Sequence, residues 1–398
     1  MKILMSFMFS ASLVLAAVPP AAAARPDVVI PFEQANGAIF IQVVVAGRPL
    51  WFIFDTGDKY AVIDLPVARA LGLGLGPPIA AGGAGSATVT GNMVAKGDVR
   101  VMGLDGFSQP LFVALPMEGL SRAEGREVDG LLGQDFIRRF VVDIDYAKQT
   151  LTLHDPSGYH YTGVGHALDI SFSAAGLPLA RARVVDVAGH PADGAFVVDT
   201  GSTGALILNT PFVAQNHFRQ PGQATVPLQD GAGVGGGLNG ETGRVSALDL
   251  AGFSIARPYA VFAQAASGVF AAADVQGNIG AQILRKFKVT LDDADELIYL
   301  EPAADFAEPL AYDMSGVTII ASGVDYRTFA VTSVLPGSAG AAAGVESEDK
   351  LIEVAGRPAA DYSLSDLRAL LRRPGTVEIE VERNGSTRAL SLILRPQI

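Results

Sequence analysis

The sequence predicts a mainly β chain made of two related lobes, followed by a small α+β module at residues 312–398. Runs of β-branched and apolar residues alternate with turns throughout, and the 398 residues include 45 Gly and 23 Pro. Few stretches have the length and 3.6-residue periodicity of a helix. Two sequence landmarks recur at almost the same distance along the chain, which indicates two copies of one structural unit.

The composition excludes several classes of protein. Hydrophobic residues make up 49% and charged residues 18%, which is enough apolar material for sizeable cores and excludes a disordered chain. The net charge of −12 disfavours a nucleic-acid partner, because phosphates would be repelled. The absence of cysteine excludes disulfides, thiolate metal sites and a cysteine nucleophile. The five histidines lack the spacing of metal ligands, so we expect no metal. The glycines at 231, 233 and 236 have the Gly-x-Gly-x-x-Gly spacing of a dinucleotide-binding loop, but no strand precedes them, so we expect no cofactor.

Residues 1–24 have the pattern of a secretory signal peptide. Lys2 precedes an apolar stretch over residues 3–17, and three alanines at 22–24 form a small-residue cleavage site. The stretch is short for a membrane span and is followed by Pro19-Pro20. We therefore expect an exported protein, periplasmic or secreted, with no membrane span after signal removal; a retained N-terminal anchor is the alternative.

The first lobe begins with two strands that lead to an acidic turn. Residues 38–45 form an apolar, β-branched run, residues 46–49 form a turn, and residues 50–54 form a second apolar run. Asp55-Thr56-Gly57 follows directly. Glycine at the third position permits a tight turn whose N–H groups approach the carboxylate.

The second lobe repeats this arrangement. Asp199-Thr200-Gly201 recurs 144 residues after the first acidic turn, again between apolar runs. Gly-x-x-Gly at 130–133 recurs 147 residues later at 277–280, and from there the copies align without a gap to residues 153 and 300. The copies span residues 28–155 and 165–303. Because repeat arrays need three or more units, we expect a pseudo-symmetric pair.

The C-terminal module has its own strand and helix signals after a linker at 302–309. Ser363 and Asp366 have the spacing of a helix N-terminus, and Pro374-Gly375 ends that helix after Arg372. Asn384-Gly385 is typical of a hairpin turn. We expect strands at residues 328–334, 350–354, 377–382 and 387–394.

Two acidic turns in symmetric lobes suggest a reaction that uses paired carboxyls. Two carboxylates about 3 Å apart do not both ionise, so they share a proton. The ionised member activates a water, and the protonated member donates to a substrate carbonyl. Supporting roles are expected for Gly57 and Gly201 through their N–H groups, for Thr56 and Thr200 through hydrogen bonds across the lobes, and for Ser202 as a donor to Asp199.

Over residues 28–303 the chain resembles the two-lobed aspartic proteases of the pepsin and retropepsin type. The resemblance rests on both Asp-Thr-Gly turns and on the segments Leu131-Leu132-Gly133 and Asn278-Ile279-Gly280. It implies two acid-protease β-barrel lobes, a catalytic pair of Asp55 and Asp199, and a peptide or protein substrate. Asn278 departs from the pattern, since an apolar residue is usual there.

Asp58 is a second departure from that family, which usually has Ser, Ala or Thr after Asp-Thr-Gly. A third carboxylate could raise the pKa of the pair by like-charge repulsion, or it could point to solvent and pair with Lys59.

Two glycine-rich stretches are candidates for flaps that cover bound peptide. They lie at equivalent places in the two copies, and ordinary mobile loops are the alternative. The candidate residues are Gly82, Gly83, Gly85, Gly233 and Gly235.

The C-terminal module resembles the PDZ domains of bacterial periplasmic proteases, through Pro336-Gly337-Ser338, Ala343-Gly344-Val345 and Asp349. Such domains bind an extended peptide at a strand edge and hold its terminal carboxylate with backbone N–H groups. Our candidate for the carboxylate loop is Ser315, Gly316, Val317 and Thr318. A β-rich module without peptide binding is the alternative.

The sequence thus predicts an exported aspartic endopeptidase with a PDZ-like domain that recruits a peptide or partner. Because the repeat supplies both carboxyls, we expect a monomer. A catalytically silent peptide-binding protein on the same scaffold is the main alternative, favoured by Asp58. Strand-edge assembly through residues 312–398 is a third possibility.

Overall fold

The computed structural model describes residues 27–83, 85, 87–228, 233 and 236–398. The expected signal peptide and Gly235 lie outside the described residues. Strands hold 45% of the chain and helices 13%, which confirms the mainly β prediction. Within the described ranges no helix is long and apolar enough to cross a membrane.

Both copies contribute strands to a central antiparallel platform. Its order is β1-β13-β12-β24-β25-β14, so the first three strands come from the first copy and the last three from the second. The bounds are β1 (Val28–Pro31), β12 (Val141–Asp145), β13 (Thr150–His154), β14 (His166–Phe172), β24 (Phe287–Asp292) and β25 (Leu297–Pro302).

A local two-fold axis passes through the centre of this platform. Asp143 lies directly opposite Thr290 where β12 pairs with β24, and these two residues are 147 positions apart, the same offset as the glycine landmarks. Thr290 Oγ1 donates to Asp143 Oδ1 at 2.5 Å. Equivalent residues of the repeat therefore meet face to face at the junction of the lobes.

The remaining strands of the first copy form a sheet in the order β6-β7-β10-β5-β11-β4-β3-β8-β9, with β2 paired to β3. The bounds are β2 (Glu33–Ala35), β3 (Ala38–Val45), β4 (Arg48–Phe54), β5 (Val62–Asp64), β6 (Gly74–Ala81), β7 (Val89–Lys96), β8 (Asp98–Val101), β9 (Gln109–Pro110), β10 (Val113–Leu115) and β11 (Gly130–Leu132). The helices are α1 (Leu65–Ala70), α2 (Glu118–Glu124) and α3 (Gln134–Ile137).

The second copy continues from the platform strand β14 in the order β15-β16-β23-β17-β22-β19-β18, with β20 and β21 as a hairpin beside β15. The bounds are β15 (Pro178–Val185), β16 (Pro191–Asp199), β17 (Leu206–Leu208), β18 (Thr225–Pro227), β19 (Gly240–Arg244), β20 (Ala247–Leu250), β21 (Phe253–Ala256), β22 (Tyr259–Ala263) and β23 (Gly277–Gly280). The helices are α4 (Thr210–Gln215), the short 3₁₀ helix η1 (Val269–Ala271) and α5 (Ala281–Leu284).

The same strand pairing recurs in both copies. In the first, β11 lies parallel to β4 with Leu132 opposite Phe54. In the second, β23 lies parallel to β16 with Ile279 opposite Val198. In the described part of the chain neither lobe closes into the expected barrel; both remain open sheets, because each lobe gives three strands to the shared platform.

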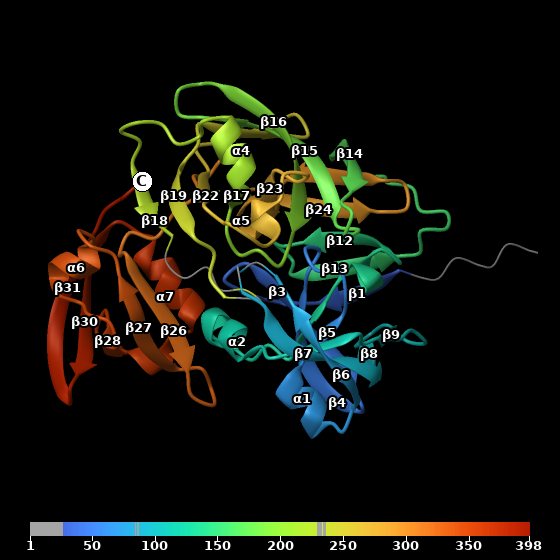
Figure 1. Cartoon of the computed structure of the whole chain (residues 1–398), viewed down its shortest axis with the longest axis horizontal. Coiled ribbons are helices and arrows are strands. Elements are labelled where there is room, and N and C mark those ends of the chain that lie inside the picture. The colour runs from blue at the N-terminus through green and yellow to red at the C-terminus, as the bar shows by residue number, and fades with distance from the viewer. Residues whose placement is uncertain (1–26, 84, 86, 229–232, 234–235) are drawn as a thin grey trace, which may run out of the picture.

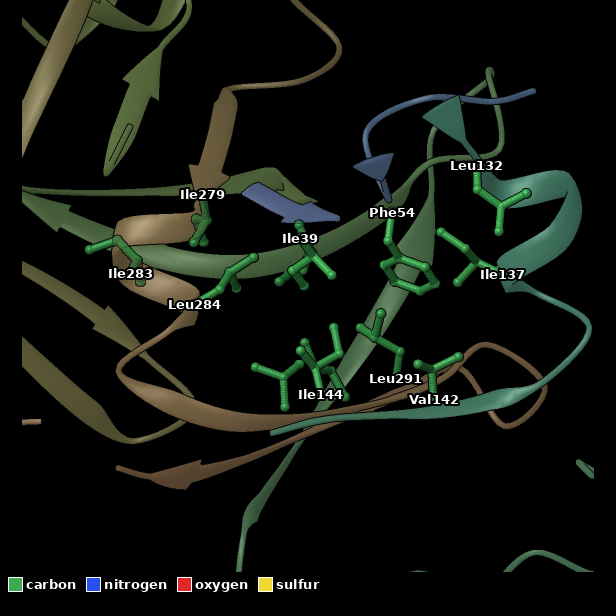
Figure 2. Close-up of a cluster of buried hydrophobic side chains, with 14 of the residues drawn as sticks. Ile39, Phe54, Leu132, Ile137, Val142, Ile144, Ile279, Ile283, Leu284 and Leu291 are labelled. Atoms are coloured by element: carbon green, nitrogen blue, oxygen red, sulfur yellow. The ribbon is translucent and has the colours of Figure 1, made fainter. Parts of the chain in front are cut away.

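One continuous hydrophobic core lies between the lobes and the platform. Figure 2 shows its centre, where side chains of the first copy and of the second copy lie side by side over platform residues. The labelled residues are Ile39, Phe54, Leu132 and Ile137 of the first copy, Ile279, Ile283 and Leu284 of the second, and Val142, Ile144 and Leu291 of the platform. Phe54 and Val198 are each at most 1% exposed, so the strands that end in the acidic turns are held rigidly by burial.

The C-terminal module is a separate sheet, β26-β27-β28-β30-β31, with β29 beside β28 and its own core. The bounds are β26 (Val317–Ser322), β27 (Thr328–Val334), α6 (Ala339–Ala343), β28 (Lys350–Val354), β29 (Arg357–Pro358), the 3₁₀ helix η2 (Ala359–Asp361), α7 (Leu364–Leu371), β30 (Gly375–Arg383) and β31 (Ser386–Leu394). In Figure 1 this module lies beside both lobes, with α2 of the first lobe between it and the rest of that lobe.

Candidate active site

The two acidic turns begin where the parallel strand pairs end. Asp55 follows β4, and its N–H donates to Leu132 O of β11 at 3.0 Å. Asp199 is the last residue of β16 and lies opposite Gly280 of β23. The downstream glycine segments that the sequence singled out are therefore the strands beside the acidic turns.

Thr56 and Thr200 connect the two turns by a reciprocal set of buried hydrogen bonds. Thr56 N donates to Thr200 Oγ1 at 3.0 Å, and Thr200 N donates to Thr56 Oγ1 at 2.9 Å. The hydroxyls donate in turn to the opposite strand, Thr56 to Val198 O at 2.6 Å and Thr200 to Phe54 O at 2.8 Å. These bonds hold the lobes in one register, as the sequence predicts for the two threonines.

Asp55 and Asp199 face each other across the two-fold axis, because each carboxyl group lies against the glycine of the opposite acidic turn. In addition to burial, the negative charge of Asp199 raises the pKa of Asp55. Gly57 and Gly201 permit this approach, because a Cβ at either glycine would collide with the carboxyl group of the opposite aspartate. The glycine N–H groups also donate to the aspartate of their own turn, at 2.8 Å for Gly57 and 3.0 Å for Gly201.

The surroundings of the two carboxyls are not symmetric. Asp199 Oδ1 accepts a second bond at 2.9 Å from the backbone N–H of Ser202. Asp199 Oδ2 accepts from Asn278 Nδ2 at 2.5 Å. The equivalent residue beside Asp55 is the apolar Leu131, so Asp199 receives one more side-chain donor than its partner.

Burial raises the pKa values of both carboxyls. Burial raises the pKa of Asp55 well above its ordinary range, and the nearby charges of Asp199 and Asp58 raise it further. Burial also raises the pKa of Asp199, but the donors at Ser202 and Asn278 oppose that shift. A proton shared by the pair is therefore held more strongly by Asp55.

Asp58 lies near the pair and acts on it through its charge. Burial raises its pKa to about 6. Its Oδ1 accepts from Tyr60 N at 3.3 Å, while Lys59 Nζ lies over the ring of Tyr60 at 5.0 Å from the ring centre. Among the described ion pairs none joins Asp58 to Lys59, and, in addition to burial, the negative charge of Asp58 raises the pKa of Asp55.

Two further side chains contribute to the site, Asn278 and Gln134. Asn278 stood out in the sequence as a departure from the usual apolar residue, and this polarity was the available signal. Gln134 is buried directly after the first glycine segment, and its Nε2 donates to Thr56 O at 3.1 Å. No sequence pattern could have predicted this role of Gln134, because any residue type can supply the backbone carbonyl group to which its side chain donates.

The candidate flap residues lie on hairpin loops of both lobes. Gly82, Gly83 and Gly85 are in the loop between β6 and β7. This loop reaches the second lobe, since a Cβ at Gly268 would lie 3.0 Å from Gly85 O. Gly233 is in the loop between β18 and β19.

The candidate carboxylate loop of the C-terminal module leads into the edge strand β26. Ser315 N and Gly316 N donate to Asp313 Oδ1 at 2.9 and 2.7 Å, and Val317 N donates to Ser315 Oγ at 3.1 Å. Thr318 lies within β26. Three N–H groups of the loop are thus engaged by side chains of the same chain.

Outside these two places the described residues offer little that could hold an ion. Across them, no group of three or more His, Cys, Asp or Glu side chains has the arrangement of a metal site. The expectation that no cofactor is needed stays an expectation.

Comparisons with known proteins agree with both resemblances. A model of the aspartyl protease family matches residues 41–136, and a model of the PDZ domain matches residues 330–383. No curated protein matches the chain. The chain thus contains an aspartyl protease domain and a C-terminal PDZ domain. The protease match includes Asp55 but ends before Asp199, and the PDZ match begins after the candidate carboxylate loop.

The threonine bonds lead to a stability prediction. Thr56→Ala removes the hydroxyl that bonds to Thr200 N and Val198 O, and both groups are buried. We therefore expect the free energy of unfolding to fall by at least about 2 kcal/mol. Urea denaturation would measure it. Thr56→Ser keeps the hydroxyl and should recover most of the loss. An alanine variant as stable as the unsubstituted protein would show that these bonds do not hold the lobes together.

A second prediction concerns Asn278. Asn278→Leu restores the apolar residue found at the equivalent place in the first lobe and removes a donor from Asp199. Because that donor lowers the pKa of Asp199, the acid limb of the pH–rate profile should move to higher pH. Peptide cleavage between pH 3 and 8 would measure the shift. If the cleavage rate of Asn278→Leu instead falls by the same factor at every pH, Asn278 has only a structural role.

Proposed function

We propose that the chain is an exported aspartic endopeptidase in which Asp55 and Asp199 are the catalytic pair. The single observation that carries the proposal is the opposition of these two carboxyls across the two-fold axis, each against the glycine of the opposite turn, with the threonine bonds joining the two turns. The match of residues 41–136 to the aspartyl protease family supports it. Export rests on the signal-like pattern of residues 1–24.

The asymmetry of donors supports a division of roles. Asp199, with donors from Ser202 N and Asn278, is the ionised member and takes a proton from a water held between the carboxyls. Asp55, whose proton is held by burial and by neighbouring negative charge, donates to the carbonyl oxygen of the scissile bond. The water oxygen bonds to the carbonyl carbon and gives a tetrahedral diol.

The second half of the reaction returns the site to its starting state. The proton on Asp199 passes to the amide nitrogen as the carbon–nitrogen bond breaks, and Asp55 regains a proton from the diol hydroxyl. The products are a carboxylic acid and an amine, and no proton is gained or lost by the pair over the cycle. The loop between β6 and β7 of the first lobe lies against the Gly268 loop of the second lobe. We propose that it closes over bound peptide and excludes bulk water.

The PDZ domain supports a role in peptide binding outside the cleft. We propose that it recruits protein substrates or partners through a peptide segment at β26. In this arrangement the chain acts as a monomer, because both carboxyls come from one polypeptide.

Removal of either carboxyl tests the proposal. Purified protein should cleave a mixed peptide library at mildly acidic pH, with or without a chelator. Asp55→Asn and Asp199→Asn should each lower kcat/KM by at least about 10³-fold, because each removes one partner of the proton transfer. Asp193→Asn, the same change at an exposed aspartate of the second lobe, is the matched control.

The outcomes separate the proposed enzyme from its alternative. Full activity in either active-site variant would refute the shared-proton mechanism. Peptide binding without cleavage at any pH, in the unsubstituted protein and in Asp58→Ser, would identify a catalytically silent peptide-binding protein.

The charge of Asp58 predicts a shift of the alkaline limb. Asp58 is ionised above about pH 6 and then raises the pKa of Asp55, which helps the pair keep its proton. Asp58→Ser and Asp58→Asn should therefore move the alkaline limb of kcat/KM to lower pH, whereas Asp58→Glu should leave it near its original place. Cleavage rates between pH 5 and 9 would measure it. An unmoved limb in both neutral variants would show that Asp58 does not act through its charge.

A further inference from the structure

The peptide groove of a PDZ domain lies between an edge strand and a helix, which in this chain are β26 and α7. A cavity of about 190 Å³ opens at the start of this groove. Val317, Leu371 and Arg372 line it from the PDZ domain, and Val226 and Tyr259 line it from the second lobe. Apolar walls beside a guanidinium group suit the end of a peptide that has an apolar last residue and a free carboxylate.

Beyond this cavity the groove is covered by helix α2 of the first lobe. The helix packs against β26. Its C-terminal cap, Gly125, lies against Leu364 at the start of α7, so closely that a Cβ at Gly125 would collide with that leucine. Figure 1 shows α2 beside β26 and α7, in the gap that faces the first lobe. The corresponding segment of the second lobe has only the short helix η1.

A hairpin turn of the first lobe ties this arrangement together. Asn36 lies in the Asn-Gly turn between β2 and β3, with φ of +52°. Its Nδ2 donates to both Glu124 O and Glu124 Oε2 at 3.1 Å. Its Oδ1 accepts from Ser365 Oγ of α7 at 3.2 Å, and its N–H donates to the same Ser365 Oγ at 2.9 Å. One side chain thus links α2 to the helix that forms one wall of the groove.

Opposite charges on Glu124 and Arg368 add to the contact. Glu124 at the end of α2 is 7% exposed, and burial raises the pKa of its carboxyl while the positive charge of Arg368 lowers it. Arg368 lies on α7 and donates to Ile319 O of β26 at 3.4 Å. It therefore occupies a backbone acceptor of the strand to which a peptide would add.

N–H groups of the candidate carboxylate loop are also hydrogen-bonded within the chain. Asp313 accepts from the N–H groups of Ser315 and Gly316, which are the type of donor that would hold a peptide's terminal carboxylate. One carbonyl group of the strand edge and two N–H groups of the carboxylate loop are thus bonded to other groups of the same chain.

We propose that α2 is the intramolecular occupant of the PDZ groove, and that a peptide with a free C-terminal carboxylate and an apolar last residue binds only by displacing it. The affinity that is measured is then the intrinsic affinity of the groove multiplied by the fraction of molecules in which α2 is undocked. Weakening the docking of α2 should tighten peptide binding without any change in the groove itself.

Asn36→Gly tests this competition. Glycine keeps the positive φ of the turn and removes the side-chain bonds to Glu124 and Ser365. Fluorescent heptapeptides with free C-termini ending in Ala, Val, Leu or Phe should bind the full-length variant about tenfold more tightly than the unsubstituted protein. Ser365→Ala, which removes the same contact from the PDZ side, should act in the same direction. Amidated peptides should bind neither protein.

Asn384→Gly is the matched control, because it makes the same change at an exposed Asn-Gly turn of the β30–β31 hairpin, where φ is +53°. It should leave peptide affinity unchanged. Hydrogen exchange would report docking directly: amides of residues 118–125 should exchange faster in Asn36→Gly, and faster in the unsubstituted protein when peptide is added.

Three results would overturn the proposal: equal affinities in Asn36→Gly and the unsubstituted protein, no peptide binding by either, or peptide binding that leaves exchange at residues 118–125 unchanged. None of these measurements uses cleavage, so they stand apart from the test of the catalytic pair.

Discussion

The hydrogen bonds between Thr56 and Thr200 are the constraint on which the site depends. Each threonine binds the backbone of the opposite turn and the strand that leads into that turn, so neither turn is complete without the other. They force two partly buried carboxyls to face each other, which is unfavourable when both are charged. The core that holds β4 and β16 supplies the rigidity that keeps this arrangement from relaxing.

Symmetry brings the carboxyls together, but departures from symmetry give them different chemistry. Identical surroundings would leave the shared proton equally on both groups. Asn278 replaces an apolar residue on one side, and Asp58 adds negative charge on the other. Both changes favour ionised Asp199 and protonated Asp55. The two residues that depart from the usual family pattern therefore act in the same direction on the pair.

Much of the fold could be predicted from local sequence, and the long-range contacts could not. Strands 328–334 and 350–354 and the capping box of Ser363 and Asp366 occur as the patterns predicted, because turns and caps are set by neighbouring residues. The repeat offset located the acidic turns and their parallel neighbours. Sequence had no signal for open sheets in place of barrels, or for the contacts of Asn36, whose partners Glu124 and Ser365 lie 88 and 329 positions away.

The position of α2 connects the two domains physically. The helix ends at Gly125, and the chain then enters β11, whose Leu132 O accepts the N–H of Asp55. Between them Asp129 fixes the path, since its Oδ2 accepts from Trp51 N of β4 at 2.8 Å. The segment that covers the PDZ groove is thus joined by a few residues to a strand that supports the acidic turn of the first lobe. Because β11 is buried and paired on both sides and Asp129 is bonded to β4, the connection between α2 and the acidic turn of the first lobe is short and is anchored at its strand end.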